Sequence, residues 1–262
     1  MKFRELCWLW GHPEGRYNGL WGNDKVSRMT PMECCDYLGL CNTFMIPAEV
    51  DVNRRQYNKS FKRLHRVGWE CNHSATDELS LRQVLDEANE FPNISCVVFD
   101  DFRGTENSFP FENLSAAIDR FHMNEVRPLD VWMVLYTYQF GKDAADDERF
   151  QPYMNAFDGV IMWTWKERDA HLIPEKFEIF KKQTPHTRRM IGVYLWNFGE
   201  SKPATAEWVK FQLEFCYEKL MKGEIEGVVF HTNTMADLDL EAYDVACDFM
   251  EAHGDDEVAW AN

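Results

Sequence analysis

Short apolar runs alternate along the whole chain with longer segments whose apolar residues recur at helical spacing. Eight runs are rich in β-branched and aromatic residues, as strands usually are; they span residues 6–10, 42–47, 66–70, 95–100, 130–138, 159–165, 190–196 and 227–232. Helical patterns lie between them at 30–40, 76–91, 111–122, 205–223 and 239–254, with shorter ones at 147–157 and 173–183. This alternation predicts a parallel sheet with helices packed outside it.

The number of units indicates a closed barrel. About eight strand–helix units in 262 residues match a (β/α)8 barrel better than an open doubly wound sheet. No G-x-G-x-x-G follows the first strand and no G-x-x-x-x-G-K-[ST] occurs, so nucleotide-binding folds are not indicated. No Pro-, Gly- or Ser-rich linker divides the chain. We therefore predict an α/β protein consisting of one (β/α)8 TIM-barrel domain over residues 1–262.

Charge and composition restrict the partners. A formal net charge of −16 argues against binding to nucleic acid or to an anionic membrane. No stretch of about 18 apolar residues predicts a membrane span, and the first ten residues lack the apolar core of a signal peptide. The eight cysteines form no C-x-x-C pair. We expect a cytoplasmic protein without metal or cofactor, whose partner is a small molecule or an oligosaccharide; the sequence does not indicate an oligomeric state.

Polar and aromatic residues gather after the carboxyl ends of the predicted strands. The opposite ends carry ordinary turn residues, as in 92–94, 127–129 and 222–227. Active sites of (β/α)8 enzymes lie at the carboxyl ends of the strands and in the loops after them. The asymmetry therefore predicts an active site at one mouth of the barrel.

Two adjacent aspartates, Asp100 and Asp101, end the fourth apolar run. Adjacent carboxylates repel each other and are costly to bury, so a functional reason is indicated. Cleaving an acetal needs one carboxyl group that protonates the leaving oxygen and a second that acts as nucleophile or base. After the seventh strand, Glu200 reaches the axial side if the chain stays extended past Asn197. We predict Asp101 and Glu200 as the catalytic pair, with Asp100 as an orienting group or in place of Asp101.

Side chains at the same mouth suit a sugar. Sugar rings have apolar faces that stack on aromatic side chains, and hydroxyl groups that form hydrogen bonds. The residues expected to bind substrate are Trp10, His12, Glu70, Arg103, Tyr136, Trp163, Trp165, Trp196, Asn197 and His231. Stacking is assigned to Trp10, Trp165 and Trp196. Orientation of the aspartates is assigned to Arg103.

The chain resembles the glycoside-hydrolase (β/α)8 superfamily in two short motifs, "FDDF" at 99–102 and "LWNFGE" at 195–200. The resemblance implies the barrel fold and hydrolysis of glycosidic bonds. Members with an acid on strand four and a nucleophile on strand seven commonly use glutamate at both positions, whereas this sequence has aspartate on strand four. That departure leaves a second arrangement open, with a strand-four aspartate as nucleophile and Glu167 or Asp169 after strand six as the acid.

Two other functions stay open. A metal-dependent sugar isomerase or hydrolase barrel would use oxygen and nitrogen ligands from Glu70, Asp100, His12, His231 and Asp237, although no H-x-H or H-E-x-x-H spacing occurs. A barrel that binds carbohydrate without cleaving it would share the tryptophans. Amide substitutions at the two catalytic carboxylates would discriminate these functions, because binding should survive while turnover vanishes.

Overall fold

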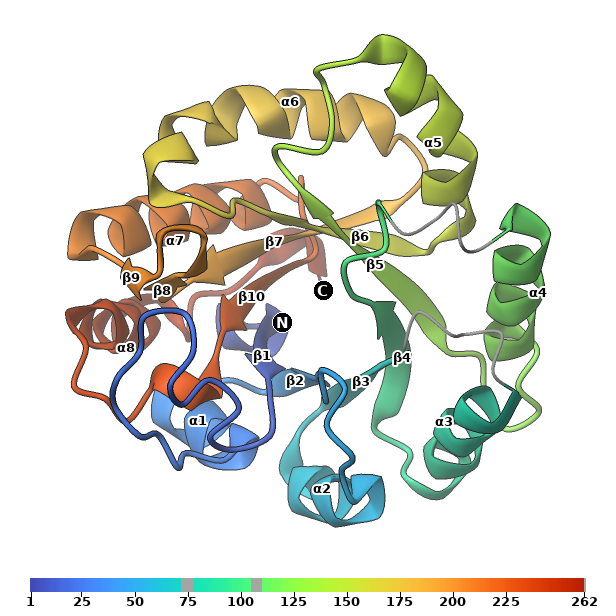
Figure 1. The fold of residues 1–262 in the computed structure, drawn as a ribbon, viewed down its shortest axis with the longest axis horizontal. Helices are drawn as coiled ribbons and strands as arrows, with labels where there is room; N and C mark the ends of the chain where they lie inside the picture. The colour runs from blue at the N-terminus through green and yellow to red at the C-terminus, as the bar shows by residue number, and fades with distance from the viewer. Residues whose placement is uncertain (72–77, 105–109, 262) are drawn as a thin grey trace.

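The structure, a computed structural model, describes residues 1–71, 78–104 and 110–261. Within these residues eight parallel strands close into a barrel, and eight helices surround it (Figure 1). The strands follow the order β1-β10-β7-β6-β5-β4-β3-β2 around the barrel. The predicted (β/α)8 barrel is confirmed.

Each barrel strand overlaps one of the predicted apolar runs. The strands are β1 Cys7–Gly11, β2 Asn42–Met45, β3 Arg66–Glu70, β4 Ile94–Phe99, β5 Asp130–Tyr136, β6 Gly159–Trp163, β7 Arg188–Tyr194 and β10 Gly227–His231. A short antiparallel pair, β8 Trp196–Asn197 and β9 Lys202–Pro203, lies outside the barrel after β7. Because helices cover the outside of the barrel and side chains fill its inside, the strands are near-continuous apolar runs.

The helices also follow the predicted patterns, with one addition. They are α1 Pro31–Leu38, α2 Arg54–Ser60, α3 Glu78–Glu90, α4 Phe111–His122, α5 Ala144–Ala156, α6 Ile173–Gln183, α7 Ala206–Met221 and α8 Glu241–His253. Thr30 caps α1 and Thr205 caps α7 by accepting hydrogen bonds from backbone N–H groups. Helix α2 was not predicted because its sequence, RRQYNKS, contains no apolar periodicity.

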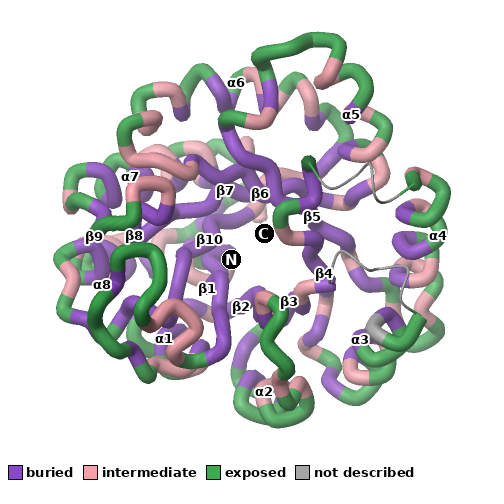
Figure 2. Tube along the Cα trace, viewed as in Figure 1, coloured by how far each residue is buried: buried purple, intermediate pink, exposed green. Residues whose placement is uncertain are grey.

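Aromatic rings fill the inside of the barrel. Burial is nearly continuous along the strands, while the outer faces of the helices are exposed (Figure 2). Trp8 stacks on Phe44 with ring centroids 4.5 Å apart. The indole of Trp163 lies across Gly192 of β7, where a Cβ atom would meet it at 2.0 Å. Glycine at position 192 is therefore what lets this indole cross the barrel.

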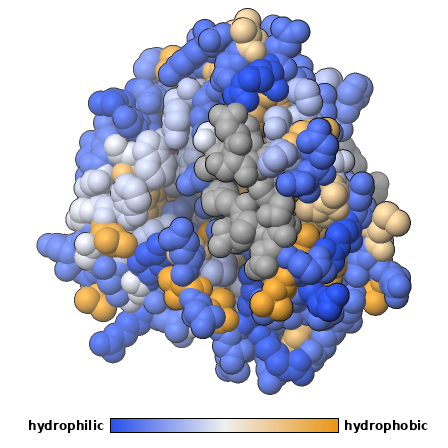
Figure 3. Space-filling model, turned by 45° about the vertical axis from the view of Figure 1, so that its right-hand side comes forward, coloured by the Kyte–Doolittle hydropathy of each residue, from blue (hydrophilic) through white to orange (hydrophobic). Residues whose placement is uncertain are grey.

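The visible surface is largely hydrophilic, with separate hydrophobic spots rather than one continuous apolar face (Figure 3). This distribution fits the acidic composition of the chain. Among the described helices, none combines the length and the apolar character that a membrane crossing requires.

Candidate active site

A cavity of about 110 Å³ lies at the carboxyl ends of the barrel strands. The side chains that line it come from β1, β4, β5, β6, β7, β10 and the loops that follow them; they are Trp10, Tyr17, Trp21, Asp100, Asp101, Tyr136, Trp163, Trp165, Tyr194, Phe198 and His231. The structure thus brings seven of the predicted site residues together, namely Trp10, Asp100, Asp101, Tyr136, Trp163, Trp165 and His231. We call this the central cavity.

Both aspartates of the opening motif reach the central cavity because the chain turns sharply at the end of β4. Asp101 has a left-handed backbone conformation, with φ of 48°, which aspartate tolerates better than most residues. Its N–H donates to Oδ1 of Asp100 over 3.0 Å. The alternation of side chains along an extended strand therefore does not separate the two carboxyl groups.

The environment of Asp100 opposes its negative charge. Burial, followed by the charges of Asp101 and Glu70, raises the pKa of Asp100 well above the usual value for an aspartate. The hydrogen bond from the Asp101 N–H acts in the opposite direction and does not outweigh them. Asp100 therefore keeps its proton at pH values at which an ordinary aspartate has lost it.

Two tyrosines flank the aspartates. Burial, nearby Tyr194 and the charges of both aspartates raise the pKa of Tyr136, as does its side-chain hydrogen bond with Asp101. Burial and the same two charges also raise the pKa of Tyr194. Both phenols thus stay protonated, and Tyr136 donates its hydroxyl hydrogen to Asp101.

His12 lies behind the wall of the central cavity and holds Tyr17. Its Nδ1 is 2.9 Å from the carbonyl oxygen of Ile46, which can only accept, so Nδ1 carries the hydrogen. Nε2 therefore accepts from the hydroxyl of Tyr17, 3.0 Å away. Burial lowers the pKa of His12 to about 3, and the ring stays neutral. The geometry places His12 as a support for Tyr17 rather than at the cavity surface.

His231 lies among aromatic rings at the end of β10. Its ring centroid is 4.6 Å from that of Phe198 and 5.0 Å from that of Tyr194. Burial and the nearby ring of His12 lower the pKa of His231 well below its usual value. Its Nδ1 has no hydrogen-bond partner within the described parts of the chain. A neutral imidazole at this place can offer a ligand a hydrogen bond without adding charge.

Four residues of the central cavity were not assigned to the site from the sequence. They are Tyr17, Trp21, Tyr194 and Phe198. Tyr17 and Trp21 belong to the long segment after β1, whereas Tyr194 ends β7 and Phe198 lies in the segment after it. Trp21 is 42% exposed and meets Trp165 edge to face at 5.6 Å, so it forms part of the rim. The signal that was available is the concentration of aromatic residues after the first and seventh strands.

Glu200 does not line the central cavity. The chain does not stay extended after β8 but forms a 3₁₀ turn over Phe198–Glu200, which points Phe198 into the cavity instead. The carboxylate of Glu200 accepts a hydrogen bond from Asn197 over 2.7 Å and lies 3.5 Å from Lys202 Nζ. These contacts lower the pKa of Glu200, Asn197 most of all. Its role as a catalytic carboxylate stays a prediction that the geometry does not support.

Other predicted binding residues support the rim or lie beside it. Trp196 is buried and donates from Nε1 to the carbonyl oxygen of Trp21 over 3.0 Å. The side chain of Asn197 is buried and donates to Glu167 and Glu200. Neither Glu167 nor Asp169 is among the residues that line the central cavity. Trp196 thus fixes the segment after β7 against the segment after β1, and Asn197 fixes it against the segment after β6.

Arg103 and Glu70, two of the predicted binding residues, are not among the residues that line the central cavity. Arg103 extends to α5, where Nη2 is 2.8 Å from Asp146 and 3.0 Å from Asp147. Glu70 accepts from the N–H of Ala48 over 2.9 Å and lines a second cavity. Arg103 is thus placed to attach α5, and Glu70 acts on Asp100 through its charge.

The ligand set of the metal-dependent alternative is not assembled. No group of three or more His, Cys, Asp and Glu side chains in the described residues is arranged to hold a metal ion. Both ring nitrogens of His12 are already in hydrogen bonds. Asp237, the fifth expected ligand, accepts from the N–H of Arg28 over 2.9 Å.

No model of a protein family matches the sequence, and no curated protein sequence matches it either. Solved structures do share its fold. Active domain 2 of a thermostable chitinase from Pyrococcus furiosus superposes with a TM-score of 0.63 at 12% identity, over 96% of this chain and 97% of that one. A chitinase from Bacteroides thetaiotaomicron gives 0.61 at 9% identity, over 96% and 98%. Tryptophan synthase from M. tuberculosis gives 0.54 at 9% identity, over 95% and 94%. At such identities the likeness shows the fold alone.

Proposed function

We propose that this protein hydrolyses glycosidic bonds in the central cavity. The observation that carries the proposal is the pair of carboxyl groups, Asp100 and Asp101, inside an aromatic cavity at the carboxyl ends of the barrel strands. Carboxyl groups in unlike environments are what acid-assisted cleavage of an acetal requires. Aromatic walls suit the apolar faces of a sugar ring.

Asp100 is the general acid in this proposal. Its raised pKa keeps a proton available for the glycosidic oxygen as the bond to the leaving group breaks. Asp101 supplies the negative charge that stabilises the positive charge developing at the anomeric carbon, and Tyr136 fixes its orientation. A water molecule then adds its oxygen to the anomeric carbon and returns a proton to Asp100.

The structural neighbours give limited support to a saccharide as substrate. Two of the similar structures are chitinases, one of them complexed with chito-oligosaccharides. Tryptophan synthase shares the fold as well, so the fold by itself does not select the substrate. The weight of the proposal therefore rests on the side chains of the central cavity.

The test is turnover by single amide variants. Purified protein is screened on aryl glycosides and on neutral oligosaccharides, and Asp100→Asn and Asp101→Asn are compared with the parent. We expect each to lower kcat by about 10²–10⁴-fold, as removal of an acid–base group does. Asp119→Asn, at an exposed position on α4, is the matched control and should retain full activity.

Each alternative gives a different result in the same experiment. Loss of activity in Glu200→Gln and in Asp101→Asn, but not in Asp100→Asn, would restore the pair predicted from the sequence and refute the assignment made here. If the parent binds saccharides but cleaves none, the protein is a carbohydrate-binding barrel and the hydrolase proposal is wrong.

A further inference from the structure

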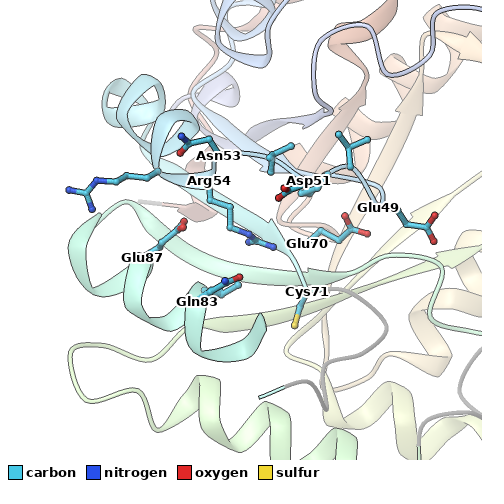
Figure 4. A pocket seen from close by; sticks show the side chains of 13 residues that line it. Glu49, Asp51, Asn53, Arg54, Glu70, Cys71, Gln83 and Glu87 are labelled. Carbon is cyan, nitrogen blue, oxygen red and sulfur yellow. The ribbon is translucent and has the colours of Figure 1, made fainter. Parts of the chain in front are cut away.

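A second and larger cavity lies beside the central one. It measures about 530 Å³, within the range of small-molecule sites, and opens between the β2–α2 loop, the end of β3 and helix α3 (Figure 4). Its polar side chains include Glu49, Asp51, Arg54, Glu70, Gln83 and Glu87. We call it the outer cavity.

The outer cavity is next to the strand that carries the aspartates, because Glu70 at the end of β3 pairs with Val98 of β4, two residues before Asp100. Glu70 lines the outer cavity, and its charge acts on Asp100 and Tyr17, which both line the central cavity. The same carboxylate accepts from the N–H of Ala48 and so anchors the β2–α2 loop that borders the outer cavity. The two cavities therefore open at the ends of neighbouring strands of the barrel.

Arg54 offers the outer cavity a hydrogen-bond donor that the protein does not use. Its guanidinium lies over the indole of Trp69, with Cζ 4.6 Å from the ring centroid. Nη1 is buried and has no hydrogen-bond partner among residues 1–71, 78–104 and 110–261. A buried guanidinium N–H without an acceptor is costly. Because the Arg54 side chain lines the outer cavity, turning Nη1 toward an acceptor atom of a ligand there would remove that cost.

The charges of the outer cavity select the kind of acceptor. Its lining contains four carboxylates, Glu49, Asp51, Glu70 and Glu87, and two guanidinium groups. One of these, Arg55, is already paired with Glu90 on the surface. A phosphate or a uronic acid would meet net repulsion here. A hydroxyl group both accepts from a guanidinium and donates to a carboxylate, so a neutral polyol matches the lining best.

We propose that the outer cavity binds a further uncharged sugar unit of the saccharide that is cleaved in the central cavity, with Arg54 and Gln83 hydrogen-bonded to its hydroxyl groups. The proposal rests on the hydrolase function proposed above. It makes the protein an enzyme for oligosaccharides rather than for disaccharides or simple glycosides.

The test is a binding measurement that does not need turnover. Calorimetry with Asp100→Asn protein uses uncharged trisaccharides of glucose, galactose, mannose or N-acetylglucosamine, together with the matching monosaccharides. Adding Arg54→Met, which keeps an apolar stem on Trp69, should weaken trisaccharide binding about tenfold or more and leave monosaccharide binding unchanged. Adding Arg82→Met, an exposed neighbour on α3 paired with Glu78, is the control and should change neither.

Gln83→Leu is the second variant. It removes the other proposed hydrogen bond to the sugar unit and tests the same proposal if the Arg54→Met protein fails to fold. Failure of every trisaccharide to bind, equal binding with and without these substitutions, or tighter binding of a uronic-acid trisaccharide would each overturn the proposal. In a further outcome, the parent hydrolyses no saccharide while the substitutions still weaken trisaccharide binding. That result would support saccharide binding in the outer cavity and refute the hydrolase function.

Discussion

At the end of β4, Asp100 lies where burial and two neighbouring carboxylates all oppose ionisation. Such a residue is suited to proton transfer, because it holds a proton that an exposed aspartate would have released. It is also a cost to the fold. Above the pKa of a free aspartate the unfolded chain gives up this proton while the native protein retains it, so the native state loses relative stability as the pH rises through that interval.

Asp100→Asn should therefore be more stable than the parent at about pH 7 and no more stable at about pH 3, where the carboxyl group is protonated in both states. Asparagine keeps an oxygen that can accept from the N–H of Asp101. Urea denaturation at the two pH values measures the difference. Equal stability at neutral pH would mean that Asp100 is ionised without cost, and would remove the basis for its role as an acid.

The positions of some site residues could be predicted from the sequence, and those of others could not. Two acids at the end of an apolar run are visible as a pattern, and both do reach the central cavity. Glu200 was placed by assuming an extended chain, and a 3₁₀ turn of three residues was enough to move it away. Arg103 was predicted to orient the two aspartates just before it in the sequence. Its partners in the structure, Asp146 and Asp147, lie more than forty positions later. Such long-range pairing leaves no local signal.

Strand β7 shows how an element serves the site, and helix α2 shows where prediction of elements from the sequence fails. Gly192 of β7 leaves room for the indole of Trp163, which in turn forms part of the cavity wall. The strands and most helices could be predicted because periodicity is a local property of the chain. Helix α2 could not, since it owes its position to tertiary packing: Asn58 is buried and accepts from Nε1 of Trp69 over 2.9 Å.

Gly192→Ala should destabilise the protein by about 1–3 kcal/mol, the usual cost of overpacking a core. The added methyl group would meet the Trp163 indole at 2.0 Å, so the ring must shift. Chemical denaturation gives the free energy of unfolding, and ligand affinity reports the shift of the wall. An unchanged free energy together with unchanged affinity would show that the indole does not depend on this glycine.

Arg103→Met should lower the free energy of unfolding by about 3 kcal/mol, because it removes one partner of a buried ion pair and leaves Asp147 without its cation. The value of kcat/KM per folded molecule should be unchanged. Denaturation and steady-state kinetics on the same preparation separate the two effects. A higher KM at full stability would instead support the substrate-binding role predicted from the sequence.

The molecule as a whole carries buried neutral histidines near the carboxyl ends of its barrel strands, and these make its stability depend on pH. Burial lowers the pKa of His12 from 6.5 to about 3. Below about pH 6 the unfolded chain therefore binds a proton that the native protein refuses, and stability falls as the pH falls. His231 acts in the same direction.

His12→Asn should make the decline of stability between about pH 6 and pH 4 shallower by about 1.4 kcal/mol per pH unit, the contribution of one proton. Asparagine can still donate to the carbonyl oxygen of Ile46. Urea denaturation across this range measures the slope. The slopes of parent and variant should coincide above about pH 7, and coincidence at acid pH as well would mean that His12 titrates normally in the native protein.

The aromatic rings that fill the barrel also determine by which route a ligand can enter and leave the central cavity. Within the described residues, Trp8 stacked on Phe44 and Trp163 laid across Gly192 fill the inside of the barrel, and the lining of the central cavity is confined to the carboxyl ends of the strands and the segments after them. A ligand that enters the central cavity at the carboxyl ends of the strands must also leave there. A saccharide chain would therefore have to bind across this mouth or enter it from one side, because it cannot pass through the interior of the barrel.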